Sequence, residues 1–194
     1  KMRHADFLIL VKDYKSLETV ANKMIAQDKV NPRIFRYLGY AAYENGNYDV
    51  AIKSIEDYMK APTNKVIGRD HLYLGFAKIK KGTNAEGVVD QAAFDDGLAD
   101  IKKAIELEPL AVEELADFGK ALFSKKQYTQ AAALFELGAG NKESKNYLDD
   151  AVYYGIAVYY GNAGKPAESR DKAALENANA TFDKVLEASP TYDE

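Results

Sequence analysis

The stretch YLGYAAYENGNYDVAIKSIEDYMKAP, residues 37–62, contains two segments with helical periodicity and a polar break between them. Small, apolar and aromatic residues recur at the spacing of one helix face in each segment, first as Phe35, Leu38, Gly39 and Ala42 and then as Tyr48, Ala51, Ile55 and Tyr58. The glycine in the ENGN break suits the left-handed conformation that ends a helix. Gly39 is unexpected, because glycine inside a helix costs about 1 kcal/mol relative to alanine.

The same pattern recurs along the chain. An apolar or aromatic residue precedes a glycine at Leu38-Gly39, Leu74-Gly75, Phe118-Gly119 and Tyr154-Gly155, with glycine spacings of 36, 44 and 36 residues. A polar break and a second periodic segment follow each glycine, and a proline closes three of these four repeats, at Pro62, Pro109 and Pro190. Pro32 closes an earlier repeat with a less regular pattern. Self-similarity at this period indicates a repeat architecture.

These residues resemble the tetratricopeptide repeat (TPR) of the bacterial type, over nearly the whole chain. The family pattern of an apolar residue and glycine, a small residue, a large apolar residue and a proline appears here as Leu38, Gly39, Ala51, Ile55 and Pro62. The resemblance implies an all-α fold, a single alpha-alpha superhelix (solenoid) of antiparallel helix pairs over residues 1–194. Five repeats are expected, at 1–32, 33–62, 68–109, 112–143 and 148–190, and we expect them to belong to a longer array.

The repeated glycines have a physical explanation in this architecture. Helices of about 12 to 15 residues are marginal in water when isolated, so their stability must come from packing. Gly39 and Ala51 are small enough to let the two helices of a pair approach closely. The cost of overpacking that contact, about 1–3 kcal/mol, exceeds the helix propensity that glycine loses.

Two repeats contain longer breaks than NGN, at residues 83–91 and 162–173. Insertions in solenoids fall in loops on one edge and often carry function. One interpretation is therefore that both segments are extended loops that face a partner. The other is that each lengthens a helix end by a turn or two.

Composition and charge exclude several classes of function. The 194 residues carry a net charge of −4, with +6 on residues 1–81 and −10 on residues 82–194. This acidic balance argues against nucleic acid as the partner, because phosphate binding needs a basic excess. No apolar run has the length of a membrane span, and the absence of cysteine excludes disulfides and thiolate chemistry. The sequence fits either a cytoplasmic or a periplasmic protein.

The sequence offers little for catalysis, and we expect no enzyme activity, no cofactor and no metal site. The two histidines, His4 and His71, are far apart, and neither an HExxH nor a P-loop motif occurs. Acidic pairs such as Asp149-Asp150 are adjacent in a helix and point about 100° apart, so they do not make a catalytic pair. At helix starts they are better explained as favourable charges near the helix dipole.

A binding surface has more support. In the family, the first helix of each pair lines the concave groove, and we expect the stripe next to the repeat glycines to bind protein. Its candidate residues are Arg33, Arg36, Tyr40, Tyr43, Arg69, Phe76, Ile79, Phe123, Ile156 and Tyr159. Aromatic residues and arginine are typical anchors of protein interfaces. The alternative for each aromatic residue is packing between neighbouring repeats.

The sequence thus predicts a non-catalytic scaffold or adaptor that binds a protein segment, acidic and with apolar anchors, through this groove. The alternative is an accessory repeat region of a larger enzyme or ligand-binding protein whose active domain lies outside this segment. The charge asymmetry also permits head-to-tail self-association.

Overall fold

The all-α prediction is confirmed by a computed structural model of the chain, which describes residues 2–27 and 31–190. Residue 1 and residues 28–30, which the first predicted repeat (1–32) includes, lie outside the described residues, as do residues 191–194. The described residues form ten α-helices: α1 (Met2–Leu10), α2 (Tyr14–Ile25), α3 (Arg33–Glu44), α4 (Tyr48–Lys60), α5 (Gly68–Lys81), α6 (Gln91–Leu107), α7 (Ala116–Ser124), α8 (Tyr128–Ala139), α9 (Tyr147–Ala163) and α10 (Lys172–Ala188). Short 3₁₀ helices η1 (Pro109–Glu114) and η2 (Ala167–Ser169) precede α7 and α10.

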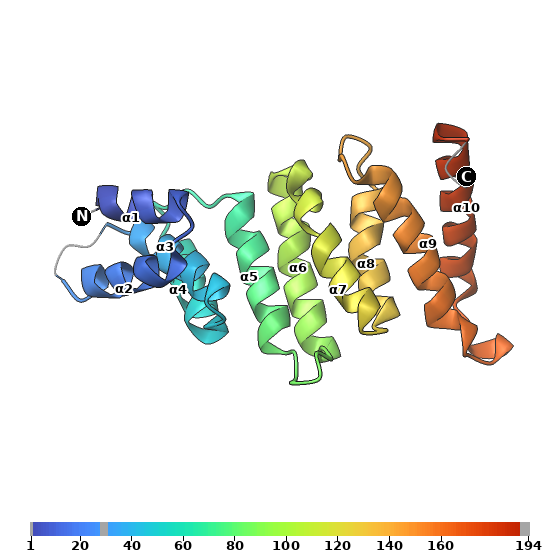
Figure 1. The fold of residues 1–194 in the computed structure, drawn as a ribbon, viewed down its shortest axis with the longest axis horizontal. Helices are drawn as coiled ribbons and strands as arrows, with labels where there is room; N and C mark the ends of the chain where they lie inside the picture. Colours follow the sequence, from blue (N-terminus) through green and yellow to red (C-terminus); the bar gives the residue numbers. More distant parts are fainter. Residues whose placement is uncertain (1, 28–30, 191–194) are drawn as a thin grey trace. The chain divides into compact units, whose positions relative to one another are not determined.

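The chain divides into two compact units, which are described separately. The N-terminal unit, residues 1–108, contains α1 to α6, and the C-terminal unit, residues 109–194, contains α7 to α10 with both 3₁₀ helices. Within each unit, helices that follow one another in the chain lie side by side as antiparallel pairs (Figure 1).

Close approach of the paired helices explains the glycines inside them. A Cβ atom added to Gly39 would lie 2.4 Å from Ile55 Cγ1, and one added to Gly155 would lie 2.2 Å from the Phe182 ring. At Gly75 the obstacle is backbone, since the added atom would lie 2.6 Å from the Gly97 carbonyl oxygen. Only a residue without a side chain allows these contacts.

The compact turns between paired helices share one conformation. Gly46, in the NGN break, has a φ of 81°, which confirms the left-handed helix end that the sequence predicted. Lys12 and Lys126 occupy the corresponding turns with φ values of 59° and 60°. An L-residue with a side chain pays about 1–2 kcal/mol for this conformation, which packing of the flanking helices must offset.

The long break between α5 and α6 is a loop. Thr83 and Val89 form an antiparallel bridge across it, and the Asn84 side chain accepts a hydrogen bond from the Val88 amide at 2.9 Å. Val89 is buried, and Asp90 caps α6 by accepting from the Ala93 amide. In the second long break, residues 162–173, both interpretations apply. Helix α9 extends into it as far as Ala163, and the connection that follows is a loop that contains η2.

No helix among residues 2–27 and 31–190 is long and apolar enough to cross a membrane. In the same residues, no group of three or more histidine and acidic side chains is arranged to hold a metal ion.

Candidate protein-binding surface

Two of the predicted binding residues, Arg36 and Tyr40, contact the buried carboxylate of Asp70. Arg36 of α3 donates from Nε and Nη2 to the two carboxylate oxygens of Asp70 in α5, at 2.7 and 2.6 Å. The Tyr40 hydroxyl donates to Asp70 Oδ1 at 2.7 Å, and the Ile67 amide donates to Oδ2 at 2.9 Å. The side chain of Asp70 is fully buried, and the Arg36 guanidinium lies 4.4 Å above the ring of Tyr58. Arg36 and Tyr40 therefore bind α3 to α5.

The electrostatics of this cluster favour the charged pair. Burial disfavours the Arg36 cation, but the hydrogen bond and the charge of Asp70 outweigh it and raise the pKa of Arg36. Burial and the neighbouring Asp70 also raise the pKa of Tyr40, so its phenol stays protonated and can donate. One feature of the sequence indicates this role: Asp70 lies five residues before the repeat glycine Gly75, where a charge on a buried helix face needs a partner.

The remaining predicted residues of the N-terminal unit differ in exposure. Phe76 and Ile79 are buried, so a partner has no access to them. Tyr43 is half-buried and packs edge-on against Tyr73, a residue that the stripe did not include. Arg33 and Arg69 are exposed, and Arg33 lies 3.2 Å from the Asp6 carboxylate.

The C-terminal unit has a group of neighbouring aromatic side chains, two of them exposed and three half-buried, which we name the aromatic surface. It consists of Phe123 in α7, Tyr128 in α8, and Tyr153, Tyr159 and Tyr160 in α9. The Phe123 ring lies 5.1 to 6.1 Å from the rings of Tyr128, Tyr153 and Tyr160. Tyr159 and Tyr160 are 61% and 51% exposed. Only Phe123 and Tyr159 belong to the predicted stripe. The other three were missed because they lie on neighbouring faces that converge only in the folded unit.

An apolar hollow of about 310 Å³ adjoins the aromatic surface between α9 and α10. Ile156 and Tyr159 of α9 line it together with Leu175 and Phe182 of α10. Ile156, the third predicted residue of this unit, therefore lies beside Tyr159. The two residues and the hollow can hold an apolar side chain from another molecule.

Charged groups of the C-terminal unit differ in their partners. Glu113 of η1 pairs with Lys145 Nζ at 2.9 Å. The Lys120 ammonium lies 5.2 Å from the centre of the Tyr153 ring, within reach of a cation–π contact. Asp150 is 1% exposed, and neither of its carboxylate oxygens has a hydrogen-bond partner among the described residues. Burial raises the pKa of Asp150 to about 7, although the charge of Lys120 opposes the shift.

The class of fold is that of helical-repeat proteins of the TPR type, and two solved structures share it. One is the C-terminal part of a TPR repeat-containing protein from Cytophaga hutchinsonii, with a TM-score of 0.65, 23% identity, and coverage of 99% of this chain and 66% of that one. The other is MamA protein, with a TM-score of 0.58, 20% identity, and coverage of 96% and 88%. This chain thus spans just under two thirds of the length of the first structure. No model of a known protein family matches the chain, and no curated protein does.

Proposed function

We propose that this chain is a non-catalytic scaffold that binds a segment of a partner protein through the aromatic surface of its C-terminal unit. Support comes from the exposure of Tyr159 and Tyr160 beside the apolar hollow. Exposed tyrosines supply large contact areas at a low entropy cost, and pockets that take an apolar anchor are typical centres of binding energy.

Apolar anchors, rather than acidic character, define the partner in this proposal. Of the arginines that favoured an acidic segment, Arg36 is already neutralised by Asp70, and Arg33 lies beside Asp6. Ile156 of α9 and Phe182 of α10 form two walls of the hollow, against which an apolar side chain of the partner can pack. A leucine, methionine or aromatic residue of the partner would occupy this place.

Affinity capture with paired variants tests the proposal. The wild-type chain, a Tyr159→Ala/Tyr160→Ala double variant and a Phe7→Ala control would each be immobilised, and the retained proteins compared by quantitative mass spectrometry. Phe7 is a matched control because it is 57% exposed on α1 and belongs to the N-terminal unit, whereas the aromatic surface belongs to the C-terminal unit. We expect the double variant to lose partners that the wild type and the Phe7 variant both retain. Identical sets of partners on all three proteins would place the interface elsewhere.

A further inference from the structure

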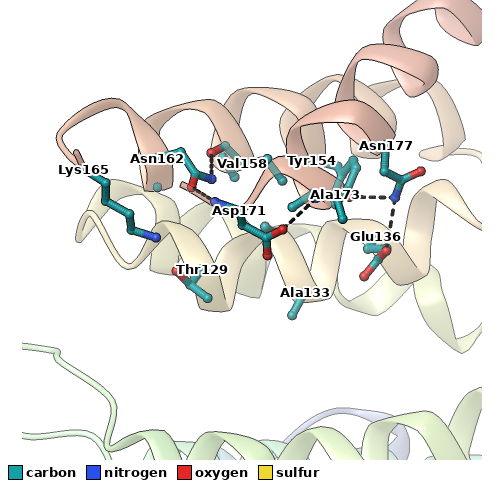
Figure 2. A pocket seen from close by; sticks show the side chains of 14 residues that line it. Thr129, Ala133, Glu136, Tyr154, Val158, Asn162, Lys165, Asp171, Ala173 and Asn177 are labelled. Atoms are coloured by element: carbon teal, nitrogen blue, oxygen red, sulfur yellow. Dashed lines mark hydrogen bonds between the residues drawn. The ribbon is translucent and has the colours of Figure 1, made fainter. Parts of the chain in front are cut away.

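The C-terminal unit contains a second hollow, of about 450 Å³, bounded by α8, α9 and α10 (Figure 2). Its walls include small apolar side chains from all three helices, among them Ala133, Ala157 and Ala174. Polar side chains stand around these methyl groups. The hollow can therefore hold a ligand that has an aliphatic stem and a polar head.

Several hydrogen-bond acceptors around this hollow receive no donor from the described residues. The Asn177 side-chain amide donates to the Tyr154 hydroxyl at 2.8 Å and to Glu136 Oε1 at 3.4 Å, which leaves its own carbonyl oxygen unused (Figure 2). Asp171 caps α10 with one carboxylate oxygen, which accepts from the Ala174 amide. Its second oxygen accepts from no described residue, and Asp171, Asn177 and Glu136 are all exposed. A ligand head that donates hydrogen bonds would meet these atoms.

The charged side chains that line the hollow carry a net charge of −1. Glu136 and Asp171 bring two carboxylates, and Lys165 brings one ammonium group. Burial raises the pKa of Tyr154; the hydrogen bond from Asn177 lowers it, and the charges of Glu136 and Asp171 raise it further. Both carboxylates therefore act on the same buried phenol. A cation is favoured at this place over an anion.

The N-terminal unit has a hollow at the same place in its own helices, and it contains a lysine. Glu56 of α4, Lys78 of α5 and Asp100 of α6 line that hollow. Lys78 Nζ lies 2.7 Å from Asp100 and 3.0 Å from Asp96, and its side chain is largely buried. An alkylammonium group thus fills this part of the N-terminal unit.

The C-terminal unit retains one acid of that hollow, the equivalent of Glu56, but lacks both the lysine and the two acids that pair with it. Counted from the residue that packs on the repeat glycine, Ile101 or Phe182, the positions of Asp100 and Asp96 carry Thr181 and Asn177. Glu56 and Glu136 are equivalent, because each follows the residue that packs on a repeat glycine, Ile55 in one case and Phe135 in the other. Lys78 lies three residues after Gly75, and the residue three positions after Gly155 is Val158. Val158 lines the hollow of Figure 2 and supplies no charge.

We propose that the hollow between α8, α9 and α10 binds an alkylammonium group from another molecule, in the place that Lys78 fills in the N-terminal unit. The aliphatic stem lies against the alanine methyl groups. The ammonium group donates to the Glu136 carboxylate, the Asn177 carbonyl and the unused oxygen of Asp171. This site is separate from the aromatic surface, so the proposal does not depend on the proposed function.

Titration with n-pentylamine, followed by NMR of the ¹⁵N-labelled chain, tests the site. We expect a Kd in the millimolar range, roughly 1–10 mM, because so small a ligand makes few contacts. The side-chain amide signals of Asn177 and the backbone amides of Ala133 and Ala157 should shift. 1-Pentanol, which has the same stem and no charge, should bind at least about fivefold more weakly.

Three substitutions separate the contribution of charge from that of shape. Glu136→Gln keeps the shape of the side chain and should weaken binding of pentylamine about fivefold to tenfold. Glu176→Gln, on the exposed part of α10, removes the same charge outside the hollow and should leave binding within about twofold. Val158→Lys should abolish binding, because it supplies the ammonium group internally. Circular dichroism checks that each variant is folded.

Two further ligands distinguish the source of the ammonium group. Tighter binding of Nα-acetyl-lysine N-methylamide assigns the site to a lysine side chain of a partner protein. Tighter binding of 1,5-diaminopentane assigns it to a free diamine, and either outcome supports an alkylammonium site. Equal binding of pentanol and pentylamine, an unchanged affinity in Glu136→Gln, or no shift up to about 50 mM amine would overturn the proposal. None of these results bears on the Tyr159 and Tyr160 experiment.

Discussion

Asp70 and Asp150 stand at the same position of their helices, five residues before Gly75 and Gly155, yet only one of the two carboxylates is paired. Asp70 accepts hydrogen bonds from two side chains and a backbone amide, whereas Asp150 has no partner among the described residues. The residue equivalent to Arg36, three before the repeat glycine, is Ala116 in the C-terminal unit. The same position thus carries an ion pair in one unit and an isolated acid in the other.

The Asp150→Asn substitution should stabilise the protein above neutral pH. The folded-state pKa of Asp150 is raised from 3.8 to about 7, so the free energy of unfolding falls as pH rises between these values and the full penalty is present above about 7. The substitution should change the melting temperature little at pH 4. At pH 8 it should raise the free energy of unfolding by about 2–4 kcal/mol. Thermal melts of both proteins at the two pH values measure this difference, and an equal effect at both would show that Asp150 is solvated.

The Asp70→Asn substitution should have the opposite sign. It removes the charge that Arg36 is paired with, and breaking a buried pair costs about 3–5 kcal/mol. We expect a large fall in the urea midpoint at pH 8. An increase in stability comparable to that of Asp150→Asn would contradict the ion pair.

Substitution of Arg36 should mainly lower the stability of the protein, because Arg36 is part of a buried ion pair. Arg36→Ala leaves Asp70 buried without its cation, and we expect a cost of about 3–5 kcal/mol in the free energy of unfolding. Arg33→Ala is the matched control, because the Arg33–Asp6 pair is exposed and such pairs contribute about 0–1 kcal/mol. Denaturant unfolding of both variants gives the comparison. Equal stabilities would restore Arg36 as a candidate binding residue.

The helix pairs could be predicted from the sequence because close approach leaves a local signature. A Cβ atom added at any of the four repeat glycines would lie less than 3 Å from a large side chain of the second helix of the pair; these glycines are Gly39, Gly75, Gly119 and Gly155. Such a contact restricts one position to glycine wherever it recurs. The helix pairs could therefore be predicted from the spacing of these glycines.

Exposure along the predicted stripe could not be predicted in the same way. Tyr40 and Tyr159 occupy neighbouring positions of one helix face, but Tyr73 of α5 stacks on Tyr40 at 4.3 Å while Tyr159 is largely exposed. What covers a residue depends on a helix about 30 residues away in the chain, and helical periodicity contains no information on it. For the same reason the position of Asp70 indicates a buried charge but does not identify Arg36, in another helix, as its partner.

The backbone contact at Gly75 makes a sharp test of the helix pairing. Gly75→Ala should lower the free energy of unfolding by about 1–3 kcal/mol, because the methyl group would meet the Gly97 carbonyl oxygen. Gly164→Ala is the control: its added methyl group would meet nothing within 4 Å, and its φ of −88° suits alanine. We expect the control to be neutral or stabilising by up to about 1 kcal/mol. Matching thermal melts for the two variants would contradict the close approach.

The loop between α5 and α6 should tolerate shortening only outside its bridge. Replacing residues 84–88 with an Asn-Gly turn keeps the bridge between Thr83 and Val89, and two-residue turns of this type connect antiparallel segments well. We expect the melting temperature to stay within about 2 °C, whereas Val89→Asp, which buries a charge, should lower it by several degrees. Circular dichroism melts compare the two variants. Unfolding of the shortened protein would show that residues 84–88 contribute to the packing.

The contacts of Arg36 also determine how the N-terminal unit opens. Its guanidinium joins α3 to α5 through Asp70 and to the connection before α5 through the Lys65 carbonyl oxygen, at 2.6 Å. Amide protons of α3 and of the first turn of α5 therefore cannot exchange with solvent independently, because exposure of either segment breaks the same buried pair. In native-state hydrogen exchange, their slowest amides should share one opening free energy and one dependence on urea. Ala116 provides no such connection, and α7 meets α9 through the rings of Phe123, Tyr153 and Tyr160 instead, so the slowest amides of these two helices should not share one opening free energy.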